Sequence, residues 1–140
     1  MSHGNLAREV LASASMVAGE IPNAQSICML DADGMELTIE RTQKALNQWN
    51  DGRPVLFLVD VMGGTPSNVA TQASAQRENP AVVAGCNPAM IIDYALMAMD
   101  DLIAFSDLIA DMARPTAVPA SISRAGPASI VTETETELAQ

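Results

Sequence analysis

The stretch 55–60 constrains the fold of this chain more than any other part of the sequence. It reads VLFLVD, five consecutive apolar residues followed by one carboxylate. An apolar run of this length, without polar alternation, is typical of a strand buried on both faces of a parallel sheet. Parallel strands need crossover connections, which are usually helices. The stretch therefore favours an α/β fold.

The rest of the chain supplies segments of both kinds. Apolar runs predict strands at 25–30, 55–60 and 81–85, and helical spacing predicts helices at 5–18, 36–50, 67–76, 90–99 and 101–112. Thr65 and Asn87 each precede a proline, the signature of a helix N-cap followed by the first helical residue. The alternation predicts a doubly wound, mainly parallel sheet of about four strands with helices on both faces.

Composition and charge argue against several classes of protein. The chain has 140 residues, 49% of them hydrophobic, which suits one domain. It contains neither an apolar run of about 18 residues nor a signal peptide, so we expect a cytoplasmic protein. A net charge of −10 disfavours nucleic-acid binding, and Cys28 and Cys86 lack the spacing of a zinc site or a disulfide framework.

The pattern of strands and helices ends near Pro115. Residues 115–140 contain three prolines, and residues 132–137 alternate threonine with glutamate. This composition is typical of a solvated, partly disordered tail. An alternative is that 117–122 or 129–132 adds an antiparallel edge strand to the sheet of this chain or of a partner chain.

Three loops precede predicted helices and carry the polar residues of interest. They are the segment from His3 to Asn5, the segment from Asp60 to Thr65, and 85–88. Ligands of open α/β sheets bind at the carboxyl ends of the strands, where such loops lie. We therefore expect all three loops to meet at one rim.

The middle loop has the character of an anion site. Gly63 and Gly64 allow the backbone to approach a ligand closely, and the following helix N-terminus offers unpaired amides. No lysine or arginine lies between residues 55 and 77, so a bound phosphate would rely on backbone and hydroxyl donors. The alternative is that the glycines serve turn geometry alone.

His3 is the single histidine of the chain, and Asp60 ends the apolar strand next to the glycine loop. A carboxylate here would repel phosphate unless it had another task. It can accept a hydrogen bond from one imidazole nitrogen, which fixes the tautomer and leaves the other nitrogen as nucleophile. The alternatives are that Asp60 only caps a loop and that His3 is a frayed terminal residue.

Three motifs together resemble a known family. They are SHG at 2–4, LVDVMGGTPSNVA at 58–70 and GCNPAMIID at 85–93. In order and spacing they are similar to the IIA domain of the mannose-family sugar phosphotransferase system, although Pro88 falls one position early. The resemblance covers residues 2–112.

The resemblance implies a phosphocarrier. His3 would accept a phosphoryl group from the phosphohistidine of HPr, through Nε2, and pass it to a IIB domain during sugar uptake. Asp60 would orient the Nδ1–H group of His3. The implied phosphate-binding residues are Gly63, Gly64, Thr65 and Ser67, with Asn68 and Asn87 at the rim. No metal or organic cofactor is needed, because a phosphoramidate is already an energy-rich donor and the protein supplies positioning.

The resemblance also implies an assembly. Residues 1–114 would form the IIA-like domain, with 115–140 as an edge strand or flexible tail. The family forms homodimers in which a C-terminal strand is exchanged. Membrane components IIC and IID, which select the sugar, would be reached only through IIB.

The chain departs from the family at its start. Members carry a hydrophobic strand of about eight residues before the histidine, whereas only Met1 and Ser2 precede His3 here. We therefore expect the first strand to be missing and His3 to lie on an untethered end. Three explanations stay open: the true start lies upstream, the segment 128–132 fills the place of the strand, or the protein is impaired.

Other functions also stay open. The dihydroxyacetone-kinase phosphotransfer subunit shares the fold and an early histidine, although its loop usually differs from GGTPSN. A IIA-like domain could instead signal through its phosphorylation state. A catalytically inactive interaction module is the third alternative.

Overall fold

Strands and helices alternate strictly along the part of the chain that the computed structural model describes, residues 1–49, 54–77 and 81–96. The strands are β1 (Ser2–His3), β2 (Cys28–Met29), β3 (Leu56–Val59) and β4 (Ala81–Ala84). The helices are α1 (Leu6–Ala18), α2 (Met35–Asn47), α3 (Thr65–Ser74) and α4 (Pro88–Leu96). The order βαβαβαβα confirms the predicted α/β class.

The strands form two parallel pairs. β1 pairs with β2, with Ser2 opposite Cys28, and β3 pairs with β4 over four residues. The expectation of one sheet of about four strands is therefore only partly right, since the described strands form two sheets of two strands each. Met1 joins them: its ammonium donates to the Leu58 carbonyl at 2.6 Å, and its carbonyl accepts from the Asp60 amide at 3.2 Å.

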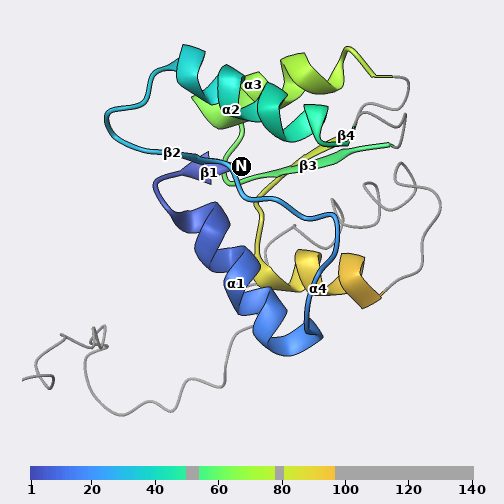
Figure 1. Ribbon diagram of the computed structural model, residues 1–140. Coiled ribbons are helices and arrows are strands. Elements are labelled where there is room, and N and C mark those ends of the chain that lie inside the picture. The colour runs from blue at the N-terminus through green and yellow to red at the C-terminus, as the bar shows by residue number, and fades with distance from the viewer. Residues whose placement is uncertain (50–53, 78–80, 97–140) are drawn as a thin grey trace, which may run out of the picture.

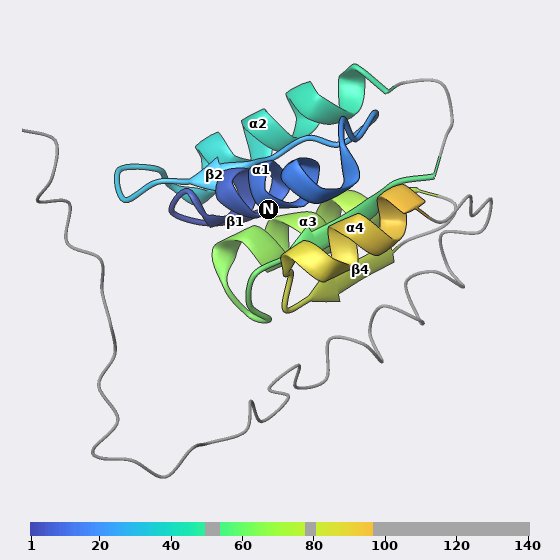
Figure 2. The same ribbon diagram turned by 90° about the horizontal axis from the view of Figure 1, so that it is seen from below.

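The helices cover both faces of the strands, as a doubly wound fold requires. In Figure 1, α2 and α3 lie on one side of the strands, and α1 and α4 lie on the other. Figure 2, seen from below, shows α1 and α4 in front of the strands and α3 behind them. Val59 of β3, Ala14 of α1 and Ala70 of α3 are fully buried between the layers. This order of layers brings the loops that follow the strands to one end.

β1 consists of two residues only, Ser2 and His3, so the run of apolar strand residues that family members carry before the histidine is not seen in the described structure. The Ser2 amide donates to the Ile27 carbonyl at 3.1 Å, and the Gly4 amide donates to the Met29 carbonyl at 2.8 Å. The Ser2 hydroxyl accepts from the Ala7 amide at 2.7 Å, which fills one of the unpaired donors in the first turn of α1. The expectation of an untethered His3 is therefore wrong, because backbone bonds hold the residues on both sides of it.

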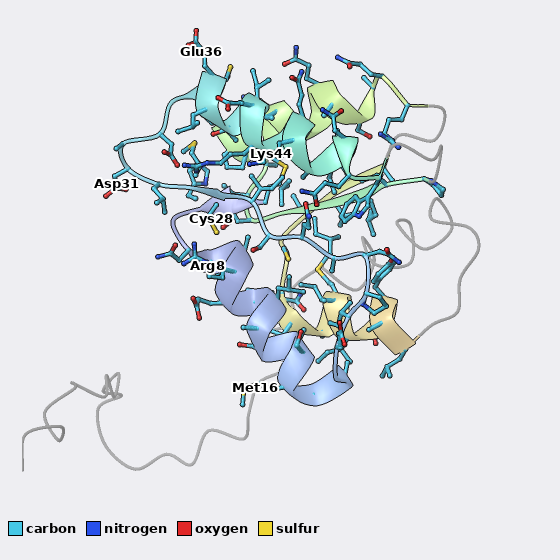
Figure 3. All side chains as sticks on the ribbon, viewed as in Figure 1. Arg8, Met16, Cys28, Asp31, Glu36 and Lys44 are labelled. Carbon is cyan, nitrogen blue, oxygen red and sulfur yellow. The ribbon has the colours of Figure 1, made fainter. Side chains whose placement is uncertain are left out.

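The side chains around β2 show how this edge of the molecule is built. Arg8 of α1 and Lys44 of α2 lie on either side of Cys28, and Met16 points away from α1 into solvent (Figure 3). Asp31 lies at the tip of the loop between β2 and α2. Arg8 and Lys44 therefore lie beside β2 and not beside the loops at the carboxyl ends of β3 and β4.

Several predictions concern residues outside the described part of the chain. They are the helix at 101–112, the alternative edge strands at 117–122 and 129–132, and the segment 128–132 as a replacement for the first strand. Among the residues that are described, no helix is long and apolar enough to cross a membrane.

Candidate active site

The three predicted loops meet at one end of the strands, around Asp60 and the ring of His3. His3 arrives from β1, and its ring contacts this carboxylate. Gly64, which precedes α3, lies against the same ring. Gly85, which follows β4, donates its amide to the Asp60 carbonyl at 3.0 Å. The prediction that the three loops meet at one edge of the strands is therefore confirmed by direct contacts between them.

Asp60 holds His3 by two bonds to one oxygen. Its Oδ2 accepts from the His3 backbone amide and lies 2.8 Å from the ring nitrogen Nδ1, with both distances equal. Its Oδ1 accepts from the Val61 amide at 2.9 Å. The Asp60 side chain is 9% exposed and that of His3 is 43% exposed. The carboxylate is therefore sheltered and fixed, while the His3 side chain remains partly accessible to solvent.

The surroundings of Asp60 favour its charged form. Burial acts most strongly and raises the pKa of the carboxyl group, but the hydrogen bonds from His3 and from the Val61 amide together bring that pKa below its ordinary value. An ionised carboxylate can only accept hydrogen bonds. Nδ1 of His3 must therefore carry the proton, and Nε2 of the neutral ring carries the lone pair.

Gly64 leaves room for the ring of His3. A Cβ atom placed on Gly64 would lie 3.0 Å from Nε2 of that ring and only 2.5 Å from Cε1, and the second distance is shorter than real Cβ atoms show. Gly64 is also the N-cap of α3, with extended backbone. Nε2 of His3 therefore lies beside a helix N-terminus, where unpaired amides and the helix dipole favour an anion.

The hydroxyl of Ser67 makes hydrogen bonds to both glycines of the loop before α3. It accepts from the Gly63 amide at 2.8 Å and donates to the Gly64 carbonyl at 2.9 Å, and Ser67 is 1% exposed. Gly63 has φ +85°, a conformation that favours glycine. These bonds set the position of Gly64 and hence of the space next to His3.

The start of α3 differs from the prediction. The Asn68 amide donates to the Gly64 carbonyl at 3.0 Å, so Gly64 is the N-cap and Thr65 is the first helical residue. The prediction that Thr65 caps this helix is wrong, and no side chain caps it. The half-buried Thr65 thus sits in the first turn, with its hydroxyl not used as a cap.

Asn68 and Asn87 lie at the edge of the site. The Asn68 side-chain amide reaches the Gly63 carbonyl at 3.5 Å. The side-chain oxygen Oδ1 of Asn87 accepts from the Met90 amide at 3.2 Å, which confirms Asn87 as the N-cap of α4. Both asparagines support the loops that surround His3.

Two positions that sequence reasoning did not select also hold the site. The Met1 carbonyl accepts from the Asp60 amide, and Gly85 turns the chain with φ +87° so that its amide reaches the Asp60 carbonyl. A glycine directly after an apolar strand was the available signal for Gly85. Met1 acts through its backbone, so its side chain gave no signal.

Comparison with known proteins assigns this arrangement to a family. The family profile EIIA-man, described as PTS system fructose IIA component, matches residues 1–113. The mannose-specific EIIAB component of the phosphotransferase system (PTS) of Escherichia coli K12 is 36% identical over 109 residues, which are 78% of this chain and 33% of that protein. The chain therefore spans about a third of the length of this relative.

Two further relatives are covered over most of their length. The fructose-specific EIIA component of the PTS of Bacillus subtilis 168 is 28% identical over 107 residues, 76% of this chain and 72% of that protein. The mannose/sorbose-specific IIA subunit of Enterococcus faecalis superposes with a TM-score of 0.73 at 29% identity, over 94% of this chain and 95% of the other. From the matched profile and these relatives, the chain belongs to the EIIA-man family and is a IIA component of a sugar phosphotransferase system.

Proposed function

We propose that this chain carries a phosphoryl group on Nε2 of His3, accepts it from phosphorylated HPr and passes it to a IIB domain. One observation carries the proposal: the Asp60 carboxylate lies 2.8 Å from Nδ1, while the opposite edge of the ring faces the N-terminus of α3. A histidine with one nitrogen held by a carboxylate and the other free beside an anion site suits a nucleophile.

The transfer step follows from this geometry. The lone pair of Nε2 attacks the phosphorus of the donor phosphohistidine, and the phosphorus–nitrogen bond of the donor breaks as the new bond forms. The proton on Nδ1 stays in its hydrogen bond to Asp60, whose negative charge stabilises the positive charge that develops on the ring. The reverse sequence delivers the group to the acceptor on IIB.

The first turn of α3 would receive the phosphoryl oxygens. The backbone amides of Gly64 and Thr65 and the Thr65 hydroxyl lie at this helix start. Gly63 and Ser67 would act indirectly, because their mutual hydrogen bond fixes the loop. Since the loop carries no lysine or arginine, the phosphoryl group would be bound weakly enough to be passed on. No cofactor takes part in this scheme.

Exposed apolar side chains beside Asp60 suit the docking of protein partners. Val61 and Met62 are 53% and 70% exposed, although both are apolar. Surface of this kind next to a reactive group is typical of a transient contact area. We propose that HPr and IIB each dock on these two side chains in turn. In the same proposal the chain acts in the cytoplasm as a homodimer. It would reach the membrane components IIC and IID only through IIB.

The test is phosphorylation from phosphoenolpyruvate through enzyme I and HPr. We expect one acid-labile phosphate on the wild-type chain, none on His3→Ala, and loss of the label when IIB is added. The matched control is Asn5→Ala, an exposed residue close to His3 in the sequence, which should retain the label. A wild-type chain that takes no label would contradict the carrier function, and a label that IIB cannot remove would favour a regulatory role.

A further inference from the structure

A pocket of about 300 Å³ lies beside β2, and phosphoryl transfer gives it no role. Residues 25–28 contribute backbone and side chains to its lining, together with Arg8 of α1 and with Arg41 and Lys44 of α2. We call it the β2 pocket. In Figure 3, Arg8 and Lys44 lie on either side of Cys28. The pocket therefore combines part of a strand with cationic side chains from two helices.

The strand presents its outer edge to the pocket. The Ile27 and Met29 carbonyls accept from amides of β1, so Cys28 between them directs its backbone groups away from β1. The Cys28 carbonyl accepts from the Arg41 guanidinium at 2.7 Å, which also lines the pocket. The Cys28 amide makes no hydrogen bond within the described part of the chain. Among the described strands none pairs with this edge, so a backbone donor stays available there.

The charge of the β2 pocket is opposite to that of the whole chain. The chain has a net charge of −10, yet three of its seven lysine and arginine residues line this one pocket. Among the described residues, no aspartate or glutamate lines it. Asp33 pairs with Arg41 and compensates its charge. Within residues 1–49, 54–77 and 81–96, Arg8 and Lys44 form no ion pair. The pocket thus offers two cations to an anionic ligand.

The chain itself contains a segment of matching charge. Residues 132–137, outside the described part, alternate threonine with glutamate, and no other stretch of six residues holds three glutamates. Successive side chains of extended backbone point to opposite sides, so the three carboxylates would share one side at a spacing of about 6.6 Å. Threonine is β-branched and favours this backbone. An extended segment of this sequence would present all its charge to one surface.

The segment is also within reach. The 35 residues 97–131 separate it from the end of α4. A coil of this length spans roughly 30 Å on average, which is about the diameter of a small domain. A segment tethered in this way has a high effective concentration at the surface of its own chain. A weak electrostatic contact is then sufficient for binding.

We propose that the β2 pocket binds the segment 132–137 of the same chain in extended form, with its glutamate carboxylates at Arg8 and Lys44. The Cys28 amide is available to donate to an oxygen of the segment. Occupancy would cover an edge strand that otherwise offers a template for pairing with another chain. This role goes beyond phosphoryl transfer, and its test needs neither HPr nor IIB.

Lys44 is the single lysine of the chain, which makes the contact accessible to zero-length cross-linking. A carbodiimide joins an amine to a carboxylate that it touches, without a spacer. On the full chain at low concentration, we expect tryptic digestion to give peptide 42–77 linked to peptide 125–140, with the bond between Lys44 and a glutamate of 132–137. Acetylation by an N-hydroxysuccinimide ester is the control for the reactivity of the Lys44 amine.

Matched variants show whether the charge of the pocket is responsible. Arg8→Gln removes one positive charge from the β2 pocket and leaves Lys44 in place. Gln72→Glu changes the net charge by the same amount on the exposed face of α3, outside the pocket. We expect the first variant to lower the yield of the cross-link at least about twofold and the second to leave it unchanged. Sodium chloride at about 0.5 M should also lower the yield. Circular dichroism confirms that both variants fold.

NMR of backbone amides gives an independent measurement. The triple variant Glu133→Gln/Glu135→Gln/Glu137→Gln should shift the amide signal of Cys28 and leave the signals of α4 unchanged. The proposal is overturned if the Cys28 signals of the two proteins coincide, or if Lys44 is acetylated but forms no link to the segment. In a mixture of isotopically light and heavy chains, links that join light to heavy would also overturn it, because the occupant would then belong to a second copy.

Discussion

Nδ1 of His3 lies 2.8 Å from Oδ2 of Asp60, although the two residues are 57 positions apart in the sequence. His3 is the last residue of β1, and Asp60 directly follows β3. The contact between the two side chains therefore forms only when β1 lies next to β3. Met1 makes backbone hydrogen bonds to the Leu58 carbonyl and the Asp60 amide, and these bonds hold β1 next to β3. The proposed nucleophile and its orienting carboxylate therefore depend on the fold at the very start of the chain.

Asp60→Asn should impair phosphorylation of His3 severely while the chain still folds. The carboxamide can donate to Nδ1, which would move the ring proton to Nε2 and block the lone pair. We expect the rate of phosphorylation by phospho-HPr to fall by about a hundredfold or more. Rapid-quench measurement of labelled protein gives this rate. Asp31→Asn, an exposed carboxylate in the loop after β2, is the control and should react as the wild type does.

Gly64→Ala should displace the ring of His3 without disturbing α3. The backbone of Gly64 is extended with φ −78°, which alanine adopts freely, but its Cβ would lie 2.5 Å from Cε1. The ring must move, and the bond to Asp60 lengthens. We expect the phosphorylation rate to fall by about tenfold or more, because misplacement of about 1 Å has effects of this order.

The control for this change is Gly34→Ala. Gly34 is the N-cap of α2, has φ −92°, and a Cβ there would meet nothing within 4 Å. Since His3 is the single histidine, its ring NMR signals report the displacement directly. Signals of Gly64→Ala that coincide with those of the wild type would contradict the steric argument.

The sequence predicted the pairing of His3 with Asp60 correctly, because loops at the carboxyl ends of parallel strands must meet. The contact of Gly64 with the ring could not be predicted, since it depends on where α3 begins relative to β1. Thr65 was assigned as the cap from its position before Pro66. In the structure Gly64 takes this place with extended backbone, and no side-chain bond is needed.

The start and the edges of the strands were harder to predict. A strand of two residues, Ser2–His3, has no periodicity to detect, and only its backbone bonds to Ile27 and Met29 define it. The apolar run 25–30 predicted six strand residues, but pairing with so short a partner leaves only Cys28–Met29 in the strand. Among the residues that the structure describes, no strand pairs with 24–27.

Ser67→Ala should destabilise the protein through the glycine loop. The hydroxyl accepts from the Gly63 amide and donates to the Gly64 carbonyl, and it is buried. Its removal takes a hydrogen-bond partner from the Gly63 amide and from the Gly64 carbonyl, at a cost of about 0.5–1.5 kcal/mol for each bond. Urea unfolding measures this loss. Ser13→Ala, on the exposed face of α1, should leave the free energy of unfolding unchanged, and an equal loss in both variants would contradict the assigned role of Ser67.

The bonds to Asp60 should make stability depend on pH in the acid range. Burial raises the pKa of this carboxyl group, but the hydrogen bonds from His3 and Val61 bring it below its ordinary value in the folded chain. Such a group contributes its full stabilisation above the unfolded pKa, about 3.9, and loses it as the pH falls through the folded pKa. The difference in unfolding free energy between wild type and Asp60→Asn should therefore be constant from pH 5 to 7 (roughly one to three units above that value) and shrink in more acid solution. Urea titrations across this range measure it, and a difference that stays constant down to the acid limit would show that the carboxylate is not stabilised by these donors.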